Sequence, residues 1–224
     1  MNMKRRVLCF GDSNTYGYDP RGGRYDDDTR WPSRMGKLLG PEYSVIEEGF
    51  NGRTCVMDDP TEGGYKSGAN YLPPCLMSHN PLDAVILMLG SNDSKKRFGL
   101  EPMTIGEGMM QLIRLTRMYA QNSDGAPAKI IVAAPPPIRD CLEKTRYRDC
   151  FGPDAIRVTR GLKDEYARIA RLLRCEFVDA AQFAALSELD SLHFTREDHL
   201  RMAEGMAKKL RAMLENADQE GRTL

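Results

Sequence analysis

The feature that most constrains the fold of this chain is an unbroken apolar run at residues 84–89. A strand that is apolar at every position is typical of a parallel sheet covered by helices on both faces, because neither face of such a strand meets water. Shorter strand-like runs recur at residues 6–10, 43–47, 129–134 and 175–179. Together these runs predict five strands.

Longer stretches suited to helices separate the predicted strands. They lie at residues 31–39, 71–78, 104–120, 155–173 and 196–214. An alternation of short strands and helices is the pattern of an α/β protein with a mainly parallel sheet. The sequence shows no repeat, linker or break in composition, so we expect a single domain over residues 1–224. The polar tail from about residue 215 is expected to fray.

The charge balance limits the class of partner. Lys and Arg total 32, as do Asp and Glu, so the formal net charge is zero. No global field then recruits nucleic acid or an anionic membrane, and we expect a small-molecule or uncharged-polymer partner. The chain begins with basic residues, but the apolar run that follows is too short for a signal sequence or a membrane span.

The cysteines and histidines give no indication of a metal site. The six cysteines are scattered and form no C-x-x-C pair or zinc-ligand spacing. His193 and His199 are six positions apart and lack the H-E-x-x-H arrangement, so we expect neither a metal nor a cofactor. The scattered cysteines and the lack of a leader predict reduced thiols and a cytoplasmic protein.

Residues with catalytic chemistry follow the predicted strands at four places. Ser13 follows the first strand, Gly52 the second and Asn92 the third, while Asp190 and His193 come after the last. In an open parallel sheet, ligands bind where the carboxyl ends of the strands point, and the five residues are therefore expected to lie together.

These residues form the complete set that acyl transfer needs. A serine hydroxyl is a weak nucleophile until a base takes its proton, and His193 can serve as that base for Ser13. Asp190 can hold the imidazole tautomer and stabilise the imidazolium. The backbone N–H groups of Ser13 and Gly52 and the side-chain amide of Asn92 can form the oxyanion hole.

Each signal has a simpler interpretation when taken alone. The stretch 90–93 consists of turn-forming residues, and a Gly/Ser/Thr loop after the first strand could cradle a phosphate. The alternative is therefore a non-enzymatic, flavodoxin-like binding module, such as a flavin carrier. That alternative leaves Asn92, Asp190 and His193 unexplained. The chain also lacks a P-loop lysine, a G-x-G-x-x-G fingerprint and a G-x-S-x-G elbow.

With these residues in place, the chain resembles the SGNH/GDSL hydrolase family, whose four blocks fall on Ser13, Gly52, Asn92 and His193. Further stretches resemble the arylesterase-type branch of that family, namely residues 30–32, 48–54, 58–60 and 134–138. The resemblance implies a three-layer α/β/α fold with a flavodoxin-like, five-stranded parallel sheet. The chain departs from the usual pattern at Asn14 (Leu), Tyr16 (Trp) and Ser91 (Thr).

The resemblance also implies an activity. We expect a serine esterase that hydrolyses short-chain acetyl or aryl carboxylic esters through an acyl-Ser13 intermediate, with Asp190 and His193 completing the triad. A carbohydrate acetylesterase, a thioesterase and a lysophospholipase are the alternatives on the same scaffold. Members of the arylesterase-type branch are often oligomers, and the long loop at residues 139–154 is the candidate contact for a homo-oligomer.

Three further residues are candidate substrate contacts. Tyr16 follows the nucleophile, and its departure from the family pattern puts the shape of the acyl pocket in question. Trp31 and Arg53 lie in the stretches that resemble the arylesterase-type branch. An arginine after a tight turn is more often a solvated or packing group, and this alternative stays open for Arg53.

Overall fold

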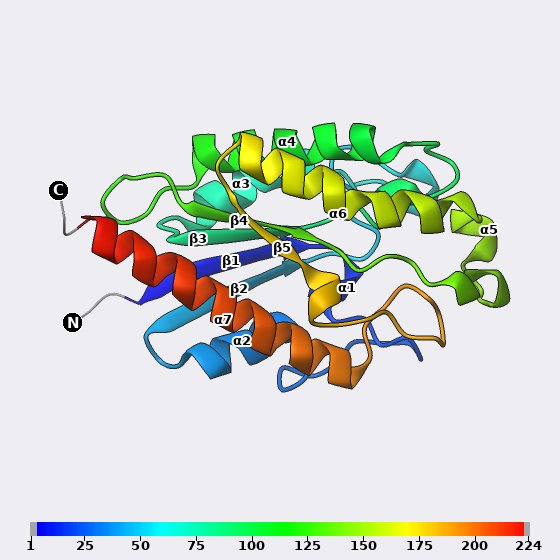
Figure 1. Cartoon of the computed structure of the whole chain (residues 1–224), viewed down its shortest axis with the longest axis horizontal. Coiled ribbons are helices and arrows are strands. Elements are labelled where there is room, and N and C mark those ends of the chain that lie inside the picture. The colour runs from blue at the N-terminus through cyan, green and yellow to red at the C-terminus, as the bar shows by residue number, and fades with distance from the viewer. Residues whose placement is uncertain (1–3, 222–224) are drawn as a thin grey trace.

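The computed structural model describes residues 4–221 and contains one five-stranded sheet (Figure 1). Its strands are β1 (Arg5–Gly11), β2 (Tyr43–Gly49), β3 (Ala84–Met88), β4 (Lys129–Ala134) and β5 (Glu176–Asp179). They are ordered β2-β1-β3-β4-β5, and every neighbouring pair is parallel. This is the flavodoxin-like order, so the predicted α/β class and sheet are confirmed.

Helices cover both faces of the sheet and make a three-layer molecule (Figure 1). The helices are α1 (Ser13–Tyr16), α2 (Trp31–Leu39), α3 (Gly68–His79), α4 (Pro102–Tyr119), α5 (Arg148–Phe151), α6 (Asp154–Leu172) and α7 (Arg196–Gly221). Helices α2 and α7 pack on one face, whereas α3, α4 and α6 pack on the other.

Strand β3 lies at the centre of the sheet and shows why its sequence is apolar throughout. Successive side chains of a strand point to opposite faces. Val85 and Leu87 belong to the core on the α3/α4/α6 face, while Ala84, Ile86 and Met88 belong to the core on the α2/α7 face. All five are buried, so both faces of the strand need apolar residues.

Several regions differ from the predicted pattern, and the four-residue α1 is not among the predicted helices. Helix α3 begins at Gly68 rather than Tyr71, because the Ser67 side chain accepts a hydrogen bond from the Asn70 N–H and caps it there. The predicted loop at residues 139–154 contains a 3₁₀ turn and α5. Helix α7 continues to Gly221 instead of ending at residue 214, and the end of the predicted frayed tail, residues 222–224, lies outside the described residues.

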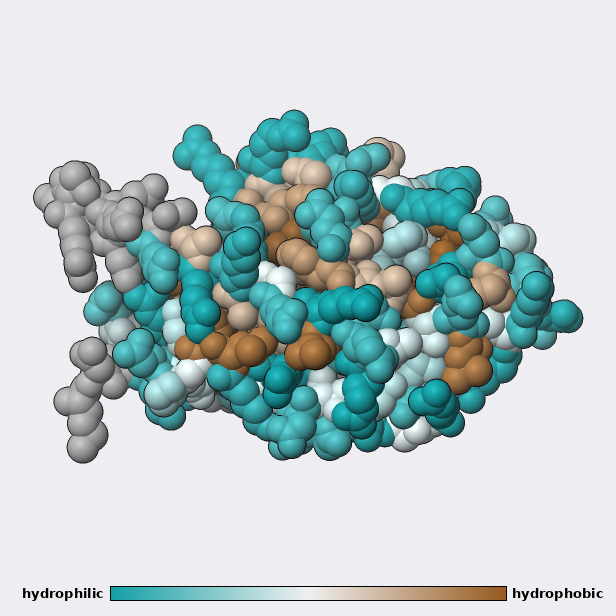
Figure 2. Space-filling model, turned by 60° about the horizontal axis from the view of Figure 1, so that its bottom comes forward, coloured by the Kyte–Doolittle hydropathy of each residue, from teal (hydrophilic) through white to brown (hydrophobic). Residues whose placement is uncertain are grey.

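One face of the molecule is largely polar. On the face shown in Figure 2, hydrophilic residues dominate and hydrophobic ones occur in small groups between them. Within residues 4–221, no helix combines the length and the hydropathy that crossing a bilayer requires.

Candidate active site

The turn after β1 places Ser13 at the start of a short helix. Asp12 is the N-cap of α1, and its carboxylate accepts a hydrogen bond from the Asn14 N–H at 2.9 Å. Helix α1 ends at Tyr16, and its C-cap, Gly17, has a φ of +86°, a left-handed conformation that glycine adopts readily. Asp12 thus braces the serine turn.

A continuous chain of hydrogen bonds joins Ser13, His193 and Asp190. The Ser13 Oγ lies 2.9 Å from His193 Nε2, and His193 Nδ1 lies 2.6 Å from Asp190 Oδ2. The carboxylate of Asp190 accepts the Nδ1 proton, which leaves Nε2 as the acceptor for the serine hydroxyl. Asp190 Oδ1 also accepts the backbone N–H groups of Leu192 and His193, both at 3.0 Å. Ser13 and His193 are 180 positions apart in the sequence. With Asp190, they meet in the geometry of a catalytic triad.

The triad carboxylate is held in its ionised form. Burial alone would raise the pKa of Asp190, but hydrogen bonding and charge attraction from His193 outweigh it and lower that pKa below its usual range. Two nearby carboxyls behave differently, because burial raises the pKa of Asp12 to about 6 and that of Asp93 to about 7. Asp190, which contacts His193 Nδ1, is thus the carboxylate placed to stabilise an imidazolium.

Asn14 fixes the loop that carries the histidine. Its Nδ2 donates to the Leu192 carbonyl at 2.9 Å, and its Oδ1 accepts the Phe194 N–H at 2.9 Å. The residues on both sides of His193 are thus bound by the residue next to Ser13. The sequence marked Asn14 only as a departure from the family pattern, since a bond to a loop 180 positions away has no local signal.

Three donors are available for an oxyanion. In the described part of the chain, the backbone N–H groups of Ser13 and Gly52 donate to no protein acceptor. Asn92 uses one amide hydrogen on the Arg53 carbonyl at 3.1 Å and keeps the other. Gly52 has φ of +77°, a conformation that a residue with a side chain would adopt only with strain.

These groups open onto one cavity of about 350 Å³. Ser13, Gly52, Asn92 and His193 all line it. Its apolar lining comes from Tyr18, Tyr147, Phe151 and Leu192, and its polar lining from Asn51, Glu62, Lys66 and Lys95. The Tyr18 ring lies over the His193 imidazole, with 4.6 Å between the ring centres. The structure thus brings the five predicted residues together: four of them line the cavity, and Asp190 is hydrogen-bonded to one of these, His193.

The three predicted substrate contacts lie outside this cavity. Trp31 is fully buried in the α2/α7 core, so contact with a substrate is ruled out by its packing. Arg53 is buried as well, and its guanidinium donates to the Gly11 and Glu48 carbonyls and stacks over the Phe10 ring.

Tyr16 packs under a second arginine. The Arg24 guanidinium lies 4.2 Å from the centre of the Tyr16 ring, and the ring does not line the cavity. Tyr18 and Tyr147 line the cavity instead. Neither tyrosine carries a sequence signal, because Tyr18 follows the short α1 and Tyr147 precedes α5 in a predicted loop.

A separate group of ligand-type atoms lies outside the cavity. Among the described residues, Glu48, Cys75 and His79 bring one potential metal-ligand atom each within 4.8 Å of the others. His79 Nε2 is 3.0 Å from Glu48 Oε1, an ion pair when the imidazole is protonated. Neither the triad nor the oxyanion donors belong to this group.

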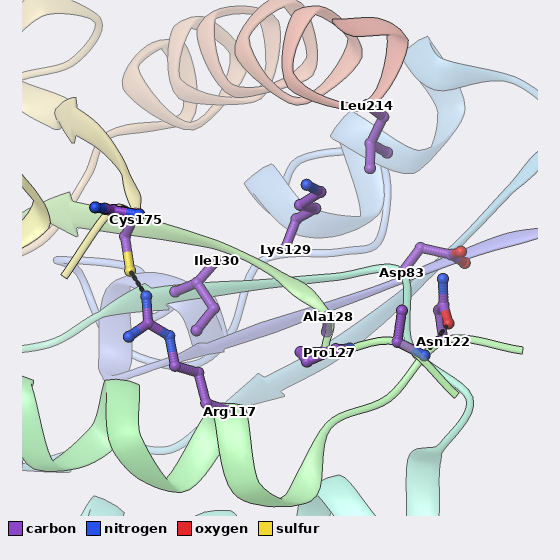
Figure 3. Close-up of a pocket in the computed structure, with 11 residues that line it drawn as sticks. Asp83, Arg117, Asn122, Pro127, Ala128, Lys129, Ile130, Cys175 and Leu214 are labelled. Atoms are coloured by element: carbon purple, nitrogen blue, oxygen red, sulfur yellow. Dashed lines mark hydrogen bonds between the residues drawn. The ribbon is translucent and has the colours of Figure 1, made fainter. Parts of the chain in front are cut away.

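A larger cavity of about 500 Å³ lies at the opposite edge of the sheet (Figure 3). Asp83 precedes β3, Lys129 begins β4 and Cys175 precedes β5, so the cavity is at the amino ends of the strands. The Arg117 side chain points at the Cys175 sulfur, 3.7 Å away. None of the predicted catalytic residues lines it. Ligand binding in open α/β sheets favours the carboxyl ends, where Ser13 lies.

Known proteins share this fold and sequence. A model of the GDSL-like lipase/acylhydrolase family matches residues 9–203. A solved structure of Est24, a carbohydrate acetylesterase from Sinorhizobium meliloti, is 34% identical with a TM-score of 0.87, covering 94% of this chain and 100% of that one. The aryl esterase of M. smegmatis is 33% identical with a TM-score of 0.86, covering 93% and 99%. A carbohydrate acetylesterase family member from S. meliloti is 32% identical with a TM-score of 0.89, covering 94% and 99%. Comparison with curated protein sequences finds no match.

Proposed function

Because the chain belongs to the GDSL-like lipase/acylhydrolase family and is an ester hydrolase, we propose that it is a serine esterase acting on short-chain acetyl or aryl esters through an acyl-Ser13 intermediate. The observation that carries the proposal is the chain of hydrogen bonds from Ser13 through His193 to Asp190, at 2.9 and 2.6 Å. Among the described residues, the other nucleophilic side chain that lines the cavity is Cys150, and its Sγ lies 2.9 Å from the Arg97 guanidinium, which does not act as a base.

The first half of the reaction transfers the acyl group to the enzyme. His193 Nε2 takes the proton of Ser13 as Oγ attacks the ester carbonyl, and Asp190 stabilises the imidazolium that forms. The developing oxyanion accepts hydrogen bonds from the N–H groups of Ser13 and Gly52 and from the Asn92 amide. The C–O bond of the ester then breaks, and His193 returns the proton to the leaving alcohol.

The second half releases the acid. Water replaces the alcohol, and His193 takes its proton as the water oxygen attacks the acyl-Ser13 carbonyl. The same donors stabilise the second oxyanion, and the bond to Oγ breaks as His193 returns the proton to Ser13. The hydroxyl, the imidazole and the carboxylate thereby regain their starting states.

The cavity supports a small substrate. About 350 Å³ lies at the small end of the range for ligand pockets, and both the acyl group and the alcohol occupy it. The rings of Tyr18, Tyr147 and Phe151 offer stacking surfaces for an aryl group. These features favour acetyl and aryl esters over long-chain lipids.

One atom favours acetylated carbohydrates as a second candidate substrate. Asn51 Oδ1 is buried without a hydrogen-bond partner in the described structure, and Asn51 lines the cavity. An unpaired buried acceptor is costly, and a substrate hydroxyl would satisfy it. Two of the similar solved structures are named as carbohydrate acetylesterases.

An activity-based probe tests the proposal. A fluorophosphonate should phosphonylate the wild-type enzyme at Ser13 and leave Ser13→Ala unlabelled, with ester hydrolysis lost in the same variant. Ser123→Ala, at an exposed loop serine, is the matched control and should behave as wild type. Labelling or hydrolysis that survives in Ser13→Ala contradicts the proposal. A panel of acetyl to long-chain nitrophenyl esters and acetylated oligosaccharides then ranks the two substrate classes.

A further inference from the structure

The peptide group between Asn51 and Gly52 is contacted by a charged side chain at its carbonyl, while its N–H is free to donate into the cavity. Its N–H belongs to Gly52 and is one of the proposed oxyanion donors. Its carbonyl belongs to Asn51 and accepts a hydrogen bond from the Lys66 ammonium at 2.8 Å. The same amide is therefore bound by a cation at one end and free to donate at the other.

Lys66 is held firmly in this position. Its ammonium lies 4.5 Å from the centre of the Phe50 ring, a cation–π distance. Its backbone N–H donates to Asp58 Oδ1 at 2.7 Å, and its backbone carbonyl accepts the Thr54 N–H at 3.0 Å. The residue is half-buried and lines the cavity. Contacts of its main chain and of its side chain together hold the Lys66 ammonium against the oxyanion loop, by which we mean residues 51–52.

The ammonium also lies next to Gly52 itself. A Cβ added to Gly52 would sit 3.4 Å from Lys66 Nζ and 2.7 Å from Glu62 Oε2. A carboxylate and an ammonium thus flank the proposed donor. Without compensation, the Glu62 charge would repel an oxyanion formed at this place.

The surrounding charges show how that repulsion is offset. Lys95 Nζ lies 2.7 Å from Glu62 Oε1 and 3.1 Å from Asp59 Oδ2, and the Arg97 guanidinium lies 3.6 Å and 2.9 Å from the same two carboxylates, so both carboxylates are paired with Lys95 and Arg97. The charged groups that face Lys66 are Glu62, Asp58, Asp59 and Lys95. Lys66 is the cation whose hydrogen bond leads directly to the oxyanion loop.

We propose that Lys66 is a positioning residue of the oxyanion hole, whose ammonium polarises the Asn51–Gly52 peptide. A charged donor on an amide carbonyl draws electron density from the amide nitrogen, which strengthens the N–H as a donor. The gain grows with the negative charge on the substrate oxygen, so it stabilises the transition state more than the ground state. The proposal rests on the proposed function, because it needs an oxyanion to act upon.

Substitutions that separate charge from size test this role. Lys66→Met keeps the length of the side chain without the charge, and Lys66→Arg keeps the charge. With an aryl acetate, we expect kcat to fall roughly tenfold in Lys66→Met, less than when a donor is lost outright. KM should stay close to the wild-type value, and Lys66→Arg should recover most of the rate. The matched control is Lys208→Met, at an exposed lysine of α7 that does not line the cavity.

The alkaline side of the pH profile gives a second readout. Burial outweighs the attraction of Glu62 and lowers the pKa of Lys66 below its usual range. The kcat of the wild type should fall as pH rises through this titration, because the neutral amine polarises the peptide less. Lys66→Met should lack that decline, and Lys66→Arg should show it only at higher pH. This measurement on the wild type stands even if Lys66→Met does not fold.

The outcomes separate this proposal from the proposed function. An unchanged kcat in Lys66→Met, an effect confined to KM, or equal losses in Lys66→Met and Lys66→Arg would overturn the role of Lys66 while Ser13→Ala remains inactive and unlabelled. Activity retained by Ser13→Ala would overturn both. The expected pattern is an inactive Ser13→Ala, a kcat loss in Lys66→Met and recovery in Lys66→Arg.

Discussion

The three histidines of the chain share one chemistry, and their surroundings give them different roles. His193 lies between a hydroxyl and a carboxylate and lines the cavity. His79 is half-buried at the end of α3, beside Glu48. His199 is fully buried, and its Nδ1 accepts the Trp31 N–H at 3.3 Å at the start of α2. Residue type therefore identifies candidates, and contacts decide among them.

The buried His199 predicts a specific pH dependence of stability. Burial lowers its pKa from 6.5 to about 3, so between these values the unfolded chain binds a proton that the folded protein does not. Folding is then disfavoured as pH falls through 6.5, and this residue should cost about 2 kcal/mol of the free energy of unfolding between pH 7 and 5. His199→Asn, which keeps an acceptor and does not titrate, should lack that contribution.

Urea unfolding of both proteins at pH 7 and pH 5 checks this prediction. Burial raises the pKa of Asp12 and Asp93, and these carboxyls act in the opposite direction in both proteins. The difference between wild type and variant isolates the histidine. The wild type should lose more stability than His199→Asn on acidification, and an equal loss in both would refute the burial argument.

Among the elements, the strands and the longer helices could be predicted from the distribution of apolar residues in the sequence. The five strands were found because each is a short apolar run, and α2 was found at its observed bounds. Helix α1 has four residues, too few to show a helical period, and α3 contains Pro73 and Pro74, which obscured its start. The Ser67 cap was a local signal that would have placed it correctly.

The site likewise contains residues that sequence patterns predict and residues that they do not. Ser13, Gly52, Asn92, Asp190 and His193 were predicted because each stands where a strand or the chain's last turn meets the carboxyl edge of the sheet, and because the family pattern marks them. Tyr18 and Lys66 lie on irregular segments with no marked pattern. Their approach to the cavity depends on turns and long-range hydrogen bonds, which sequence periodicity does not encode. Trp31 lies in the α2/α7 core and not at the cavity, because a conspicuous aromatic residue in a family stretch can serve packing alone.

The bonds from Asn14 join two elements, and their loss should affect catalysis and stability together. Asn14→Leu, which introduces the residue usual in the family, leaves the Leu192 carbonyl and the Phe194 N–H buried without their partner. We expect a loss of about 2–4 kcal/mol in the free energy of unfolding, because each unpaired buried group costs about 1–3 kcal/mol. The loop that carries His193 should also become less well positioned, so kcat should fall while KM changes little.

Denaturant unfolding and steady-state kinetics measure the two effects. Asn14→Asp is the companion variant: it keeps the acceptor for the Phe194 N–H, loses the donor to Leu192 and adds a buried carboxyl group, so its kcat should also fall below the wild-type value. Wild-type stability and rate in Asn14→Leu would show that α1 and the histidine loop hold their places without this residue.

At the scale of the whole molecule, the two hydrophobic cores share the strands that separate them. Residues of β1, β3 and β4 alternate between the α3/α4/α6 core and the α2/α7 core. Loss of either helical layer would expose one face of every central strand to water. The catalytic groups depend on both layers, because Ser13 follows β1 while His193 precedes α7.

This shared sheet predicts that the chain unfolds as one cooperative unit, as expected for the proposed single domain over residues 1–224. Trp31 is the single tryptophan and lies in the α2/α7 core, so its fluorescence reports that face. Far-UV circular dichroism reports all helices, including those of the opposite face. In urea the two signals should give the same unfolding midpoint and the same slope, because neither core is stable once one helical layer has left the shared strands. A fluorescence transition separated from the dichroism transition would mean that the two layers unfold independently and that the chain holds two folding units.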